Sequence, residues 1–319
     1  MARKMSSEAN FEKFASELIS VSVGNIAFGG RGKTPTVAFV ARTLQAMGER
    51  VAILSRGYGR RVVADGVTVV SDGTDILADL DQAGDEPLML ARELLGISVL
   101  VCDQRAVAAA LAQHVLGSTA VVLDDGFQHR EMRRDVDLVL VAPGDLTGRR
   151  VPLGRLRESP SALGRATATV VDELGGDFDR NRLRAHFGGP VFRLRRHTHA
   201  PAGLTASARV FVLAGIAGPE RVALAAADAG YVVAGQWTPG DHHRYTRADV
   251  VRLAREAAAA DAVAVLTTAK DAERLRPFRP LPFDVHVLGH SVTIEADDNG
   301  PSFDTWLRER VRPATGGHP

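Results

Sequence analysis

The sequence predicts an α/β fold with two units, each built around a largely parallel sheet. From Val21 onward, short β-branched runs alternate with longer segments of helical spacing, which is typical of parallel strands joined by crossover helices. The first apolar run leads into a glycine-rich loop that ends Gly32-Lys33-Thr34. The alternation then breaks and restarts near Ala208. Together these features predict a P-loop NTPase-type doubly wound parallel sheet with a second, smaller α/β domain.

The first unit is expected to alternate strands and helices in chain order. Each expected helix starts after a loop and carries apolar residues at helical spacing. The expected strands are Val21–Ala27, Val51–Leu54, Ser98–Cys102, Thr119–Leu123 and Leu138–Val141. The expected helices are Thr34–Met47, Glu86–Leu95 and Ala106–Leu116. The glycines at 175–176 and 188–189, with Pro190, indicate an irregular connection before the second unit.

The second unit repeats this alternation. Strands are expected within RVFVLAGIAG, YVVAGQW and AVAVLTT, and helices through Ala229, over Arg247–Ala259 and from near Lys270. Before the first strand, apolar residues at i, i+3, i+4, i+7 and i+8 from Phe11 make one stripe on an expected amphipathic helix. We therefore predict an N-terminal helix over residues 1–20, a P-loop domain over 21–205 and a second α/β domain over 206–319.

Composition excludes several classes of protein. Lys+Arg 39 against Asp+Glu 38 gives a net charge of +1, and aromatics make up only 5%, so a nucleic-acid-binding NTPase is disfavoured. The single cysteine, Cys102, lies in an apolar run where a buried strand position is expected, and a disulfide framework is excluded. No apolar run approaches the ~20 residues of a membrane-spanning helix, and no signal peptide is recognisable, so a cytoplasmic location is expected.

The glycine loop is the strongest functional motif. Its backbone N–H groups and the positive end of the following helix favour phosphate oxygens. Lys33 is expected to reach the terminal phosphates, and the Thr34 hydroxyl to ligate Mg²⁺. Ala27 stands where the usual pattern has glycine; the alternative is a tight turn with an incidental lysine. The expected nucleotide-binding residues are Ala27, Phe28, Gly29, Gly30, Arg31, Gly32, Lys33 and Thr34.

Two carboxylates follow the apolar strand that ends at Leu123. Asp124 is placed as the strand-end acid that holds Mg²⁺, directly or through water. Neighbouring side chains at a strand end point in different directions, so Asp125 is expected to face the substrate. The alternative is an ordinary Asp-Asp-Gly turn.

A second acid, Asp85, opens a predicted helix. Capping alone would explain it, but a carboxylate there can also accept a proton from an attacking hydroxyl if a partner orients it. The sequence Asp241-His242-His243 follows a predicted strand and offers that partner. Exposed loop histidines are the alternative; a metal site is disfavoured because no Cys or further His lies at ligand spacing nearby.

A basic loop, GRRVPLGRLRE, carries four arginines from Arg149 to Arg157. Guanidinium groups there are suited to bidentate phosphate contacts, although a solvated basic loop is equally ordinary. Glu158 closes the segment and is expected to assist the metal or to pair with an arginine. Arg56, after the strand that ends at Leu54, adds another cation at the same sheet edge.

Taken in order, these motifs resemble one family, the tetraacyldisaccharide 4'-kinases of lipid A biosynthesis. The resemblance runs from Val21 to Leu275 through VGNIAFGGRGKTP, LSRGYGR, GDEP, LDDGFQH, PLGRLRE, GIAGPE, DHHRY and LTTAKDAERL. It implies ATP- and Mg²⁺-dependent phosphorylation of the 4'-hydroxyl of a lipid disaccharide 1-phosphate. It also implies peripheral contact with the cytoplasmic side of a Gram-negative inner membrane. The alternative is a P-loop ATPase switch acting through a protein partner, although no N-K-x-D motif is evident.

The resemblance also implies residue roles. Lys33 and Thr34 would serve ATP and Mg²⁺, and Asp85 with a histidine of DHH would form the catalytic dyad, with His242 preferred. Asp124, Asp125 and Glu158 would line the metal and phosphate region, with Asp125 also counted as catalytic. Candidate substrate contacts are Arg56, Arg155, Arg157 and His243. The chain departs from the family in its short N-terminal segment, in Arg31 for a small residue and in Arg155 for a proline.

Overall fold

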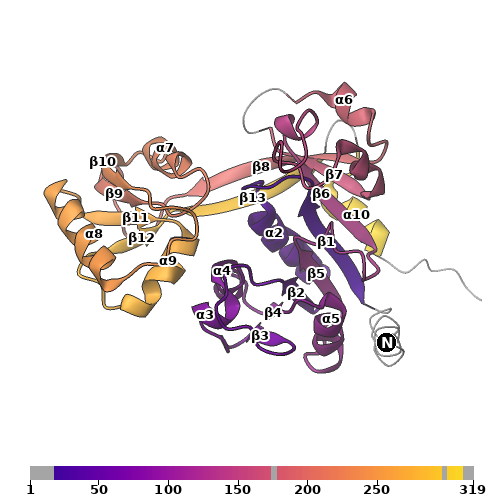
Figure 1. Ribbon diagram of the computed structural model, residues 1–319, viewed down its shortest axis with the longest axis horizontal. Helices are drawn as coiled ribbons and strands as arrows, with labels where there is room; N and C mark the ends of the chain where they lie inside the picture. The colour runs from indigo at the N-terminus through magenta and orange to yellow at the C-terminus, as the bar shows by residue number, and fades with distance from the viewer. Residues whose placement is uncertain (1–17, 174–177, 297–299, 312–319) are drawn as a thin grey trace, which may run out of the picture.

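The computed structural model describes residues 18–173, 178–296 and 300–311, which form two sheets with helices around them (Figure 1). A helix was predicted over residues 1–20. Residues 1–17 of that range lie outside the described residues, and Ile19 belongs to the first strand. In the described part of the chain, no helix is long and apolar enough to cross a membrane.

The larger sheet has nine strands in the order β13-β8-β7-β6-β1-β5-β2-β4-β3. Its interior strands are parallel, whereas the edge strands β3 and β13 run antiparallel to their neighbours. This confirms the predicted doubly wound parallel sheet. The strands are β1 (Ile19–Asn25), β2 (Val51–Ser55), β3 (Thr68–Ser71), β4 (Ser98–Val101), β5 (Ala120–Asp124), β6 (Val136–Val141), β7 (Ala168–Val171), β8 (Val191–His199) and β13 (Gly289–Ala296).

The interior strands β2, β4, β5, β6 and β7 are buried along their whole length, which explains why they are continuous apolar runs in the sequence. Cys102, just after β4, is buried as expected. Helices cover the sheet and bury the apolar side chains of its strands. They are α2 (Lys33–Ala46), α3 (Leu80–Ala83), α4 (Asp85–Glu93), α5 (Arg105–His114), α6 (Arg180–Arg184) and α10 (Phe303–Val311), with the 3₁₀ turns Pro143–Asp145 and Pro160–Arg165.

The smaller sheet has four parallel strands in the order β10-β9-β11-β12. These are β9 (Arg209–Leu213), β10 (Val232–Trp237), β11 (Ala264–Thr267) and β12 (Val285–Val287). Its helices are α7 (Glu220–Asp228), α8 (Arg247–Ala259) and α9 (Ala269–Leu275), followed by the 3₁₀ turn Arg276–Phe278. The predicted second α/β unit is therefore present.

The connection between the units differs from the prediction. The stretch expected to be irregular contains α6 and β8, and β8 pairs with β13 from His199↔Gly289 to Phe192↔Ala296. This ribbon runs from the large sheet to the smaller unit (Figure 1). The strand β13 and the helix α10 pack with the large sheet, although both fall within the predicted 206–319 domain. We therefore propose that, among the described residues, 18–173, 178–199, 289–296 and 300–311 form the first unit and 200–288 the second.

Candidate active site

The glycine loop connects β1 to α2, as predicted. The backbone at Gly32, the residue before α2, has φ 78°, a conformation that glycine adopts readily. Lys33 extends its ammonium to within 3.2 Å of Asp125 Oδ1 and 3.3 Å of Asn25 Oδ1. Thr34 is buried in the first turn of the helix. The loop and the helix N-terminus together form a cradle suited to an anion.

The basic loop around Arg155 lies directly against the glycine loop. The Phe28 N–H donates to the Arg155 carbonyl at 2.8 Å, and the Arg157 N–H donates to the Ile26 carbonyl at 2.7 Å. The Arg157 guanidinium also stands 4.6 Å from the centre of the Phe28 ring. Two segments far apart in the sequence are thus fixed to each other by backbone hydrogen bonds.

Guanidinium groups from three elements surround the glycines of this loop. A Cβ added to Gly32 would lie 2.8 Å from Arg196 Nη2, and one added to Gly30 would lie 3.9 Å from Arg221 Nη2. A Cβ on Gly29 would collide with Arg155 Nη2. Side chains at Gly29 and Gly32 would therefore displace these cations, whereas one at Gly30 would only reach contact distance of Arg221. The cations gathered around the loop fit a polyphosphate. Arg31 does not join this group, because its guanidinium pairs with the buried carboxylate of Asp145.

Asp124, the last residue of β5, and Asp125, which follows it, have different partners, in agreement with the expectation that their side chains point in different directions. Asp124 is buried and accepts a hydrogen bond from Ser55 Oγ at 3.0 Å. Burial and the nearby carboxylates of Glu86 and Asp125 raise the pKa of Asp124 to about 6. Asp125 contacts Lys33 and accepts from Arg157 Nη1 at 2.6 Å. Burial opposes its ionisation, but these two cations prevail and lower its pKa.

A divalent cation would suit this environment. Asp124 and Thr34 both line the cavity described below, and a buried carboxylate surrounded by negative charge gains from a cation. In the described ranges no cluster of three or more His, Cys, Asp or Glu side chains could hold a metal, so water and phosphate oxygens would have to complete the coordination shell.

Glu158 does not join Asp124 and Thr34 at the expected cation site. Its carboxylate accepts from Arg165 Nη2 at 2.9 Å and from Gln128 Nε2 at 3.0 Å, and lies 3.6 Å from Arg130 Nη2. Gln128, Arg130 and Arg157 line the cavity, whereas Glu158 does not.

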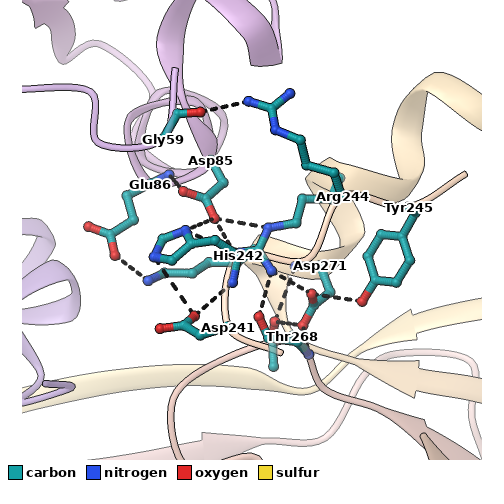
Figure 2. Close-up of polar contacts among 12 residues, drawn as sticks. Gly59, Asp85, Glu86, Asp241, His242, Arg244, Tyr245, Thr268 and Asp271 are labelled. Atoms are coloured by element: carbon teal, nitrogen blue, oxygen red, sulfur yellow. Dashed lines mark hydrogen bonds and ion pairs between the residues drawn. The ribbon is translucent and has the colours of Figure 1, made fainter. Parts of the chain in front are cut away.

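The acid that opens α4 meets the histidine of the second unit. Asp85 is buried, and its Oδ2 lies 3.2 Å from His242 Nδ1, as the sequence predicted for this pair (Figure 2). Its Oδ1 accepts the Glu86 N–H at 2.9 Å. Burial opposes ionisation of Asp85, but the hydrogen bond from His242 and the charges of Arg274 and Lys270 lower its pKa. The hydrogen bond to Asp85 raises the pKa of His242.

Arg274, on α9, was not assigned a role from the sequence. Its Nε donates to Asp85 Oδ2 at 2.9 Å, and its Nη1 donates to Asp271 Oδ1 at 2.9 Å and to the Gly215 carbonyl at 2.6 Å. Asp271 in turn accepts from the Tyr245 hydroxyl at 2.9 Å and from other groups of the second unit (Figure 2). This buried network ties the carboxylate of the first unit to the core of the second. The only sequence signal was the motif LTTAKDAERL, which contains Arg274.

His243 has a different environment from His242. Its Nε2 lies 3.3 Å from Asp249 Oδ2, and its ring packs edge-on against Trp237 and Tyr245. It does not line the cavity, unlike His242. The structure thus separates the two histidines that the sequence left as alternatives.

Further polar contacts join the two units beside this network. Arg244 Nη2 donates to the Gly59 carbonyl at 2.6 Å, and its Nη1 pairs with Asp81 (Figure 2). Arg92 on α4 pairs with Glu273 on α9 at 2.7 Å. Lys270 and Glu86 form another ion pair between the same two helices.

One cavity of about 2540 Å³ collects these groups from both units. The first unit contributes the glycine loop Phe28–Thr34, the acids Asp124 and Asp125, and the predicted substrate residues Arg56 and Arg157. Arg105 and His129, neither predicted from the sequence, also line it; Arg105 is buried and its Nε has no hydrogen-bond partner among the described residues. The second unit contributes Asp241, His242, Lys270 and Arg221.

A glycine loop between a central strand and a helix, with a buried acid at the end of the adjacent strand, defines a P-loop nucleotide-binding protein. The sequence model of the LpxK family, tetraacyldisaccharide-1-P 4'-kinase, matches residues 1–312. The chain belongs to this family.

Individual relatives and a crystal structure support the same family assignment. The chain is 41% identical over 283 residues to the tetraacyldisaccharide 4'-kinase of Anaeromyxobacter sp. strain Fw109-5, covering 81% of this chain and 74% of the relative. It is 36% identical to that of Syntrophus aciditrophicus over 92% of this chain and 84% of the relative. The crystal structure of LpxK from Aquifex aeolicus in complex with ATP superposes with a TM-score of 0.74 at 26% identity, covering 98% and 99% of the two chains.

Proposed function

We propose that this protein is an ATP-dependent kinase that transfers the γ-phosphate to the 4'-hydroxyl of a tetraacyl disaccharide 1-phosphate in lipid A biosynthesis. Family membership and the names of its relatives support the activity. One observation of the structure carries it: the glycine loop and His242, which contacts Asp85, line the same cavity from opposite units.

Residues of the first unit would hold the nucleotide. The backbone of Phe28–Gly32 and the Lys33 ammonium bind phosphate oxygens, and Thr34 with Asp124 hold Mg²⁺. Bound Mg²⁺ would neutralise phosphate charge as the transfer proceeds. Arg157 and Lys33 would keep Asp125 ionised at the edge of this cradle, where it orients Lys33. Since Glu158 pairs with Arg165 and Gln128, we assign it to bracing the loop 149–157 rather than to the metal.

The Asp85–His242 pair would receive the acceptor hydroxyl. Asp85 Oδ2 already accepts from His242 and Arg274, whereas Oδ1 has one backbone donor and keeps a lone pair for the sugar hydroxyl. A carboxylate kept ionised in this way orients the hydroxyl and accepts its proton as the phosphorus–oxygen bond forms. Catalysis then depends mainly on positioning and on charge neutralisation.

The arrangement favours a sugar hydroxyl over water as acceptor. The base comes from the first unit and its histidine partner from the second, so a competent site exists only when the units are together. Arg56 and the buried Arg105, at the carboxyl edge of the large sheet, are cations suited to the anionic end of the substrate. We also propose that the protein meets this acylated substrate as a peripheral protein on the cytoplasmic side of the inner membrane.

The test is a transfer assay with purified protein, Mg²⁺ and labelled ATP. Label is expected to move to a tetraacyl disaccharide 1-phosphate and not to its 4'-deoxy analogue. Lys33→Ala is expected to lower kcat/KM by about 10²-fold or more, because removing one positioned cation from a developing charge costs on that order. ATP hydrolysis that is indifferent to the lipid would instead indicate an ATPase switch and overturn the kinase proposal.

The proton-accepting pair is tested separately in the same assay. Asp85→Asn is expected to lower kcat by about 10²-fold or more while the Kd of ATP changes little, since general-base catalysis contributes on that order and the glycine loop is intact. His242→Ala is expected to have a lowered kcat, and His243→Ala, the matched control, is expected to keep a kcat close to that of wild type. A fully active His242→Ala variant beside an inactive His243→Ala variant would transfer the role to His243.

A further inference from the structure

The glycine loop faces more than one cation, and most of these already have a carboxylate partner. Lys33 pairs with Asp125 and Arg196 pairs with Asp172 at 2.5 Å. Arg157 also pairs with Asp125. These ion pairs fix the side chains but leave less of their charge for a nucleotide. A cation without such a partner would contribute more to binding a polyphosphate.

Arg221, the second residue of α7, is such a cation and belongs to the other unit. Its Nε and Nη2 donate to the carbonyls of Gly218 and Ala217, at 3.4 and 3.1 Å. Among the residues that the structure describes, no carboxylate lies within ion-pair distance of Arg221. Its side chain is exposed and lines the same cavity as the glycine loop. The guanidinium charge therefore faces the cavity without being neutralised.

The position of Arg221 brings it to the phosphate cradle. Its Nη2 is 3.9 Å from where a Cβ on Gly30 would stand, which is contact distance across the gap between the units. Gly218 has φ 72°, and a Cβ there would collide with the Arg221 guanidinium. The turn before α7 therefore needs glycine both for its backbone conformation and for the path of this side chain.

We propose that Arg221 binds phosphate oxygens of the nucleotide held by the glycine loop, so that the second unit contributes directly to nucleotide binding. The guanidinium exchanges its two carbonyl acceptors for anionic oxygens, which are the stronger partners. Nucleotide binding thereby draws α7 toward the glycine loop, and with it the unit that carries His242. The inference rests on the proposed kinase function, which it extends by assigning a motif, GIAGPER, that the catalytic residues leave unexplained.

The experiment measures equilibrium binding of Mg-ATP, Mg-ADP and AMP to the full chain by isothermal titration calorimetry. Arg221→Ala is expected to raise the Kd of ATP and ADP by about tenfold and that of AMP by less than about twofold, because a charge-assisted hydrogen bond to the outer phosphates is lost. Arg221→Lys keeps the positive charge but lacks the two parallel N–H donors of guanidinium. Its Kd values for ATP and ADP are expected to lie between those of wild type and Arg221→Ala. The matched control is Arg247→Ala, an exposed arginine that opens α8 of the same unit and does not line the cavity.

Two results would overturn the inference. One is an Arg221→Ala variant whose Kd values for ATP and ADP equal those of Arg247→Ala. The other is an equal loss of affinity for ATP, ADP and AMP together with a lowered Tm, which would mean that Arg221 stabilises its own loop rather than binding phosphate. Nucleotide binding can be measured without a lipid acceptor. If wild-type protein fails to phosphorylate the disaccharide, the kinase proposal is refuted, but the comparison of Kd values between Arg221→Ala and Arg247→Ala still decides the role of Arg221.

Discussion

Asp85 illustrates how a buried carboxylate is kept ionised. Three positive or proton-donating groups from the second unit face it, namely His242, Arg274 and Lys270, and together they outweigh the cost of burial. Oδ2 is shared between His242 and Arg274, so the carboxylate is held in one orientation. The chemistry of the first unit therefore depends on charges that the second unit supplies.

Replacing Arg274 is expected to raise the pKa of Asp85. Transfer requires ionised Asp85, and Arg274→Met removes a cation that lowers the pKa of this carboxyl. In the NMR titration profile of the Asp85 carboxyl, the pKa should rise by about one unit or more, since an adjacent opposite charge shifts a pKa by that order. Arg274→Lys should shift it less, because the charge stays.

The control for this profile is Arg92→Met. Arg92 joins the same two helices through Glu273 but does not contact Asp85, so it tests the loss of an inter-unit ion pair alone. Thermal unfolding monitored by circular dichroism verifies that each variant is folded. Identical Asp85 titration profiles for wild type, Arg274→Met and Arg274→Lys would contradict this effect of Arg274 on the Asp85 pKa.

Asp124 is expected to reduce the stability of the protein without metal at neutral pH. Its folded pKa, about 6, lies above the ordinary aspartate pKa of 3.8 that applies to the unfolded chain. As pH rises through the window between these values, the unfolded chain releases a proton that the folded protein retains, so stability falls. Asp124→Asn mimics the neutral form and keeps a partner for Ser55.

At pH 7.5 in EDTA, the free energy of unfolding of the Asn variant should therefore exceed that of wild type by about 1–3 kcal/mol. The difference should disappear near pH 4, where wild-type Asp124 is protonated when folded, and Mg²⁺-dependent ATP binding should be lost. Urea denaturation at both pH values measures this. A variant less stable than wild type at pH 7.5 would show that the ionised carboxylate is stabilised by its surroundings.

At the scale of elements, the site depends on how closely β1 approaches the turn after β5. A Cβ on Gly24, in β1, would lie 2.6 Å from Phe127 Cβ and 2.8 Å from the Phe127 backbone nitrogen. Phe127 is almost completely buried, so it has little room to move. The absence of a side chain at Gly24 sets the spacing between the glycine loop and the Asp124-Asp125 turn.

Gly24→Ala is accordingly expected to destabilise the protein by about 1–3 kcal/mol, the usual cost of overpacking, and to weaken ATP binding by displacing that turn. Gly144→Ala serves as the control because it is exposed and a Cβ there meets no atom within 4 Å. Chemical denaturation and ATP titration are the measurements. Normal stability and affinity in Gly24→Ala would mean that the turn can relax at little cost.

The elements that the sequence predicted are those with a strong local pattern. The strand Val51–Ser55 is fully buried and apolar, and α8 carries a capping box at Thr246, so both were found close to their true bounds. By contrast, β8 reads VFRLRRHTH because half of it leaves the large sheet as an exposed ribbon. Its partner β13 lies beyond the whole second unit, and a local pattern does not reveal a pairing of that range.

The same limit applies to the site. Residues in the glycine loop, in Asp124-Asp125 and in the Asp85–His242 pair stood at strand ends or helix starts, where sequence indicates chemistry. Arg274, Arg221 and Arg105 lie on helices, and only the meeting of elements gives each its function. His243 was a candidate by adjacency alone, and its contact with Asp249 could be found only from the fold.

At the scale of the whole molecule, two units with separate cores meet over one cavity. The first lines it with the glycine loop and the second with His242, while the buried Asp85 and Arg274 contact each other and His242 without lining the cavity. They are joined covalently at the ribbon of β8 and β13 and by a set of polar contacts near α4 and α9 (Figure 1). Since these contacts are ion pairs and hydrogen bonds rather than apolar packing, we expect the loss of one of them to weaken the association of the units.

Arg244 tests how far catalysis depends on this contact. It bridges from the second unit to the Gly59 carbonyl and Asp81 and touches neither Asp85 nor the glycine loop. Arg244→Ala should shift the population toward separated units, so kcat should fall by about three- to tenfold, the effect of losing a partly exposed ion pair with a hydrogen bond. Affinity for ATP should fall less, since most nucleotide contacts belong to the first unit.

Hydrogen exchange gives the independent measurement. In Arg244→Ala, amides of α4 and of the 240–244 loop should exchange faster, while those of β5 and β6 should be unchanged. The control is Arg252→Ala, which removes an ion pair to Glu256 within α8. If Arg244→Ala kept full kcat and wild-type exchange in α4, the Asp85–Arg274 network alone would suffice to hold the units together. If exchange rose while kcat stayed normal, assembly of the two units would not limit turnover.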